Sequence, residues 1–66
     1  MTRIRELRQG RGLSVIDLAF ETRIHPSLLS CVERRKSAAS DRVKNALSSF
    51  FGVDESSVFE HDGLAL

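Results

Sequence analysis

Few side chains in this sequence are able to do chemistry, and most of those are cationic. The run Arg34–Lys36 offers three positive charges that form either a solvated surface or a site for an anion such as phosphate. Cys31, the single cysteine, is either a passive thiol or a redox-sensitive group. His61 has no His, Cys or Asp partner at metal-ligand spacing, and no nucleophile–base pair or paired carboxylates can be placed. The sequence therefore predicts no metal, no cofactor and no enzymatic activity.

Length, cysteine count and charge distribution narrow the class of protein. The 66 residues suffice for one small domain, and a single cysteine indicates a reducing, cytoplasmic setting. No apolar run approaches the roughly 18 residues of a membrane span, and no signal peptide is expected. Residues 1–44 contain ten basic and five acidic residues, a net charge of +5, whereas residues 45–66 contain four acidic and no basic residues, a net charge of −4. This asymmetry indicates either a cationic side for a polyanion or ordinary solvated helix faces.

Helical periodicity and helix-capping residues recur along the chain, and no strand or hairpin pattern interrupts them. We expect helices over about residues 3–10, 15–22, 26–34 and 41–51, and a short helical turn after residue 54. Thr2, Ser14 and Ser40 are the expected caps, and Pro26 suits the first position of the third helix. We expect residues 1–60 to form one domain and residues 61–66 to form a flexible C-terminal tail. The apolar residues of the second helix are Val15, Ile16, Leu18, Ala19 and Phe20.

The connection between the second and third helices is the most informative feature. Three residues, Arg23–His25, are too few for a relaxed antiparallel hairpin and suit two helices that cross steeply, as in a helix-turn-helix. At this point the chain resembles the Cro/C1-type (XRE) helix-turn-helix family. The resemblance covers about residues 3–59 and rests on the segments Ile4–Arg8, Gly12–Ser14, Asp17–Ala19, Ile24–Ser27, Leu29–Ser30, Val32–Arg34, Lys36, Phe51–Asp54 and Val58–Phe59.

This resemblance implies an all-α, compact five-helix domain with a central helix-turn-helix, similar to lambda repressor, that places its third helix in the major groove of duplex DNA. The residues at the family's base-contacting positions are Pro26, Ser27, Ser30 and Cys31. The residues at or beside its phosphate-contacting positions, including backbone N–H groups at the start of the second helix, are Ser14, Val15, Arg23, His25, Arg34, Arg35 and Lys36. The resemblance also implies an ion pair between Arg8 and Glu33.

The chain departs from the family pattern at several of these positions. Val15 stands where the family usually has Gln, so its side chain offers no hydrogen bond. Arg23 and Arg35 stand where the family usually has Gly, and such positions generally need a positive φ, which costs a non-glycine residue about 1 kcal/mol. The expected base-contacting side chains include no Arg, Gln or Asn for bidentate contacts. We therefore expect a modest sequence preference, or one that rests on DNA shape.

Two function classes follow from these observations. The first is a sequence-specific, duplex-DNA-binding transcriptional regulator of the small prokaryotic, phage or mobile-element repressor type. The alternative is a protein-interaction module, or an antitoxin or adaptor, that keeps the fold but binds DNA weakly; Val15 and the low net charge favour it. No small-molecule ligand is evident. A homodimer through the C-terminal helices is one use of the apolar residues there, which can equally close the core of a monomer: Phe51, Val53, Phe59, Leu64 and Leu66.

Overall fold

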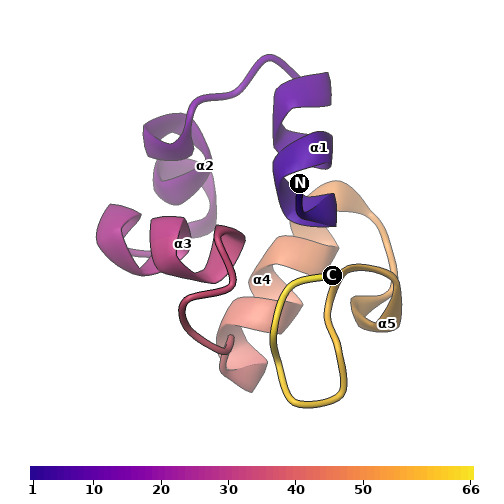
Figure 1. Ribbon diagram of the computed structural model, residues 1–66. Coiled ribbons are helices and arrows are strands. Elements are labelled where there is room, and N and C mark those ends of the chain that lie inside the picture. Colours follow the sequence, from indigo (N-terminus) through magenta and orange to yellow (C-terminus); the bar gives the residue numbers. More distant parts are fainter.

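Capping side chains determine where the first four helices begin. The hydroxyls of Thr2, Ser14 and Ser40 each accept a hydrogen bond from the backbone N–H three residues further on, and Nδ1 of His25 accepts one from the Ser27 N–H. These bonds satisfy N–H groups that the helix itself leaves unpaired. The computed structural model describes all 66 residues, and its helices (Figure 1) are α1 (Arg3–Gly10), α2 (Val15–Thr22), α3 (Pro26–Glu33), α4 (Asp41–Phe51) and α5 (Glu55–Val58).

The all-helical, five-helix class expected from the sequence is confirmed. The Asp17 carboxylate accepts a hydrogen bond from the Ser14 N–H, which completes the capping box of α2 and lowers the pKa of Asp17. Asp54 precedes α5 as expected, but its side chain makes no capping bond. The Ser57 hydroxyl donates to the Asp54 carbonyl instead.

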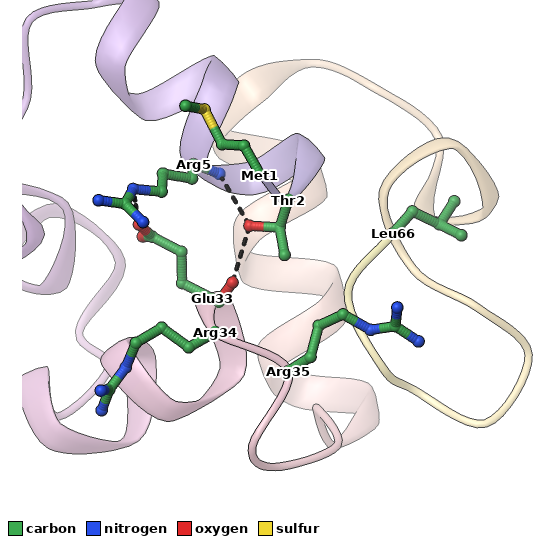
Figure 2. Close-up of a pocket in the computed structure, with 7 residues that line it drawn as sticks. All are labelled: Met1, Thr2, Arg5, Glu33, Arg34, Arg35 and Leu66. Atoms are coloured by element: carbon green, nitrogen blue, oxygen red, sulfur yellow. Dashed lines mark hydrogen bonds and ion pairs between the residues drawn. The ribbon is translucent and has the colours of Figure 1, made fainter.

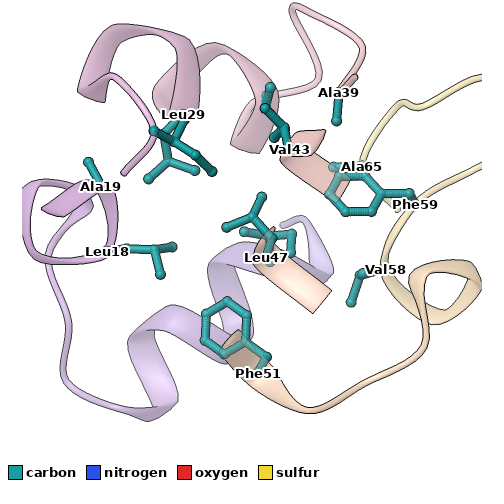
Figure 3. Packing of buried hydrophobic residues seen from close by; sticks show 13 residues of the cluster. Leu18, Ala19, Leu29, Ala39, Val43, Leu47, Phe51, Val58, Phe59 and Ala65 are labelled. Atoms are coloured by element: carbon teal, nitrogen blue, oxygen red, sulfur yellow. The ribbon is translucent and has the colours of Figure 1, made fainter. Parts of the chain in front are cut away.

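One hydrophobic core joins all five helices. Apolar side chains from each helix and from the segments between them converge on α4 (Figure 3). In α2 only Leu18 and Ala19 are buried, whereas Ile16 and Phe20 are exposed. The buried residues of the core are Ile4, Leu18, Ala19, Ile24, Leu29, Val32, Ala39, Val43, Leu47, Phe51, Val58, Phe59 and Ala65.

The C-terminal segment differs from the flexible tail expected over residues 61–66. It turns back so that Ala65 is fully buried, and the Gly63 carbonyl accepts a hydrogen bond from the Ala39 N–H at 2.8 Å. The Leu66 carbonyl accepts another from the Arg3 N–H at 2.6 Å. The expected boundary at residue 60 therefore has no counterpart in the packing. The physical reason is that two small residues, Gly63 and Ala65, let this backbone approach the core closely.

The same packing leaves fewer apolar residues exposed for the expected homodimer contact. Phe51 and Phe59 are buried and so close the core of the monomer. Val53 and Leu64 are half-buried and Leu66 is partly exposed. A homodimer through the C-terminal helices stays a prediction that depends on these three residues.

We expect Gly63→Ala to lower the free energy of unfolding by about 1–3 kcal/mol. Gly63 has a φ of +94°, and a Cβ atom there would lie 2.7 Å from the Ala39 carbonyl oxygen, which is backbone and cannot move aside cheaply. Urea denaturation measures the change. Gly10→Ala is the matched control, because that position has open space and an ordinary φ. A Gly63→Ala variant as stable as the wild type would contradict the docking of this segment.

Candidate nucleic-acid interface

The turn between α2 and α3 is three residues long and is anchored by its middle residue. Arg23 ends α2 in the left-handed conformation, with φ 57° and ψ 36°. Ile24 is buried, and its N–H bonds to the Ala19 carbonyl at 3.1 Å. His25 then caps α3 ahead of Pro26, the first residue of the helix. This geometry fixes the direction in which α3 leaves the turn.

One side of α3 faces the solvent. Leu29 and Val32 are fully buried, and at 100° per residue the opposite side of the helix holds Ser27, Cys31 and Arg34. We call these three residues, together with Ser30 at the margin, the outward face of α3. All four lie within two turns of helix, so the structure brings together three of the residues expected to contact bases, Ser27, Ser30 and Cys31, with Arg34 from the expected phosphate contacts. The fourth expected base contact, Pro26, is at the first position of α3 and outside this face.

These residues differ in exposure. Ser27 and Arg34 are exposed, and Pro26, Ser30 and Cys31 are half-buried. The thiol of Cys31 is free. Apart from Arg34, the outward face of α3 consists of short side chains, so a DNA groove can approach the helix backbone closely.

Donors for an anion flank this face. Arg23 precedes α3 and Lys36 follows it, and both are exposed. His25 uses Nδ1 as the acceptor in its cap, which leaves Nε2 as a donor. At the start of α2, the Ser14 hydroxyl accepts a hydrogen bond from the Asp17 N–H, and the Ser14 carbonyl accepts one from the Leu18 N–H. The preceding N–H groups, including that of Val15, have no intrahelical acceptor and are available to a phosphate.

Arg35 differs from the other expected phosphate contacts. Its φ of 63° places it in the left-handed region, and the hydrogen bonds Arg35 N–H to Val32 carbonyl and Lys36 N–H to Cys31 carbonyl end α3 in a Schellman motif. Its guanidinium pairs with Glu60 at 2.5 Å. Arg35 therefore terminates the helix, and its charge is already engaged by the C-terminal segment.

Arg8 and Glu33 form the ion pair that connects α1 to the end of α3. Nε and Nη2 of Arg8 donate to the two carboxylate oxygens of Glu33 at 3.0 and 2.7 Å, and both residues are buried. Nη1 of Arg8 also donates to the Leu13 carbonyl at 2.8 Å. Hydrogen bonding to Glu33 raises the pKa of Arg8, so its guanidinium stays protonated. The arrangement holds α3 against α1 and the loop that leads to α2.

Two further contacts at Glu33 were missed by sequence reasoning. The Thr2 hydroxyl, besides capping α1, donates to the Glu33 carbonyl at 2.7 Å, and the Arg5 Nε lies 3.8 Å from the Glu33 carboxylate (Figure 2). These residues line a shallow hollow together with Arg34 and Arg35. The three arginines diverge in Figure 2, with Arg5 against Glu33 and Arg35 directed toward the C-terminal segment. The hollow is therefore part of the scaffold that holds α3 in place.

We expect Arg23→Gly to raise the free energy of unfolding by up to about 1 kcal/mol, since glycine adopts a positive φ without strain. Urea denaturation tests this. Arg35→Gly relieves similar strain but removes the pair with Glu60, a half-exposed contact worth about 0–1 kcal/mol, so we expect a smaller gain. A clear loss of stability in Arg23→Gly would contradict the strain argument.

The fold and the outward face of α3 define a small helix-turn-helix domain. A helix-turn-helix family model matches residues 4–58. The chain belongs to this family, the Cro/C1 (XRE) type of DNA-binding helix-turn-helix regulators. Comparisons with curated proteins and with solved structures found no match. None of the helices is both long and apolar enough to cross a membrane.

Proposed function

We propose that this protein is a sequence-specific regulator of the repressor type that binds duplex DNA with α3 in the major groove. The observation that supports this most directly is the outward face of α3, which apart from Arg34 consists of short side chains and is flanked by the exposed cations Arg23 and Lys36. Cations at both ends of a groove-sized helix suit the two phosphate backbones that border the groove. A bound domain of this kind represses by covering a DNA site that another protein needs.

The contacts divide into two groups in this proposal. Pro26, Ser27, Ser30 and Cys31 contact base edges, with the methylene and sulfur of Cys31 against a thymine methyl group. Phosphates are bound by cationic side chains and by N–H or O–H donors at the helix starts, namely Arg23, Arg34, Lys36, His25, Ser14 and the Val15 N–H. Arg35 can contact a phosphate only if its ion pair with Glu60 breaks. No cofactor or metal is involved.

A protein-interaction role is the second candidate. It is favoured by the exposed apolar side chains of Ile16 and Phe20 on α2 and by the net charge of only +1. Such a module would keep the fold while its affinity for DNA is weak.

The dependence of DNA affinity on salt separates the two candidates. For a regulator, log K for a random duplex falls linearly with log salt, with a slope of about −0.9 for each phosphate neutralised. We expect Lys36→Ala to flatten this slope by about one unit. Lys44→Ala is the matched control, because Lys44 pairs with Asp41 and borders an acidic hollow with Glu55 and Glu60. Salt-independent or undetectable binding of the wild type would reject the regulator and favour the interaction module.

A further inference from the structure

The helix α2 exposes two large apolar side chains that the fold does not use. Phe20 is 85% exposed and Ile16 is 63% exposed. They lie four residues apart and so form one stripe along the helix. Leu18 and Ala19 on the opposite side already attach α2 to the core. Neither folding nor core packing therefore accounts for the stripe.

A second, acidic stripe runs beside the apolar one. Asp17 and Glu21 are also four residues apart and exposed, and neither forms an ion pair within the chain. The helix contains no Lys or Arg, although residues 1–44 as a whole have a net charge of +5. We call Ile16, Asp17, Phe20 and Glu21 the outward face of α2. Its charge opposes contact with phosphate and favours contact with a cationic surface.

The outward face of α2 is poorly suited to binding a second copy of the chain. The two apolar side chains offer on the order of 300 Å², less than the roughly 800 Å² that a stable interface buries on each partner, so the acidic stripe must contribute to any contact made here. A twofold contact between two copies would also bring the acidic stripes toward each other. A complementary partner needs apolar and basic side chains in parallel stripes, which is the surface that a basic amphipathic helix presents.

We propose that the outward face of α2 is a docking site for a basic amphipathic helix of a partner protein. Apolar side chains of the partner, spaced three or four residues apart, cover Phe20 and Ile16. Lys or Arg side chains along one flank of the partner helix pair with Asp17 and Glu21. This interaction uses the outward face of α2, whereas the DNA contacts proposed for α2 are confined to its start, at Ser14 and the Val15 N–H.

The test uses a fluorescent helical peptide of about 18 residues with a leucine stripe flanked by lysines, and measures its binding by anisotropy. We expect Ile16→Gln/Phe20→Gln to raise the Kd for this peptide at least tenfold, and Glu21→Gln to raise it about threefold and to weaken its salt dependence. The matched control is Leu66→Gln, another partly exposed apolar residue, which should leave the Kd unchanged. Because Phe20 and Ile16 are exposed, the variants should keep the wild-type melting temperature.

Three results would overturn the proposal. One is equal binding of the peptide by the wild type and by Ile16→Gln/Phe20→Gln. Another is equal binding of a peptide in which glutamates replace the lysines. The third is sedimentation of the wild type as a dimer and of the double variant as a monomer, which would assign the stripe to a second copy of the chain. Affinity for random duplex DNA, measured in parallel, should be the same in all variants, so failure here is distinguishable from failure of DNA binding.

Discussion

Removing either partner of the Arg8–Glu33 pair should lower the free energy of unfolding by about 3 kcal/mol or more. Both side chains are buried and hydrogen-bonded to each other through two atoms each, so a single substitution leaves an uncompensated charge. A single core in a domain of fewer than about 70–80 residues rarely supplies more than about 3–5 kcal/mol. Glu33→Ala and Arg8→Ala should therefore be close to unfolded at physiological temperature.

A double-mutant cycle, with the free energy of unfolding measured in urea, gives the coupling energy between Arg8 and Glu33 apart from the effect of each substitution alone. The exposed pair Arg3–Glu6, with 3.9 Å between its charged atoms, serves as the control, and we expect its coupling to be under about 0.5 kcal/mol. If Arg8→Ala and Glu33→Ala show no more coupling than this control, the pair does not hold α3 against α1.

The second large effect should come from the outward face of α3. Cys31→Gln places a bidentate amide at the centre of that face, and such an amide pairs with N6 and N7 of adenine. We expect the variant to prefer adenine at one position of its site by about 1–3 kcal/mol over the other bases. Competition between duplexes that differ at single positions measures this preference.

The control for this experiment is Ser49→Gln, which adds the same amide at an exposed position on α4. That variant should show no new base preference. A base preference of equal size in both variants would mean that the added amide changes base preference without lying in the major groove.

Local sequence signals predicted most of the fold. The caps at Thr2, Ser14 and Ser40 lie within three residues of the N–H groups that they satisfy, so the spacing alone located the helix starts. The positive φ of Arg23 and Arg35 followed from the family pattern of glycine at those positions.

Contacts between distant segments could not be predicted in the same way. The Arg35–Glu60 pair and the Gly63–Ala39 contact join residues 24 or 25 positions apart, and no local pattern indicates them. The acidic composition of the C-terminal segment suggested a solvated tail, whereas its small residues allow it to pack. Apolar residue type likewise did not determine which side of α2 is buried.

The site was predictable to a similar degree. The resemblance placed Ser27, Ser30 and Cys31 together on the third helix and paired Arg8 with Glu33. Sequence reasoning missed that Glu33 also binds Thr2 and approaches Arg5, because these contacts depend on how α1 packs against the end of α3.

Selection of bound duplexes from one random library, followed by sequencing, tests most directly whether α3 enters the major groove. The wild type, Cys31→Gln and Lys36→Ala are compared under the same salt concentration. Our account predicts that Cys31→Gln changes the preferred sequence, whereas Lys36→Ala weakens binding to all sequences about equally and leaves the preference as it was. The opposite result, an unchanged preference in Cys31→Gln and an altered one in Lys36→Ala, would contradict the account and show that α3 is not the helix that contacts the bases.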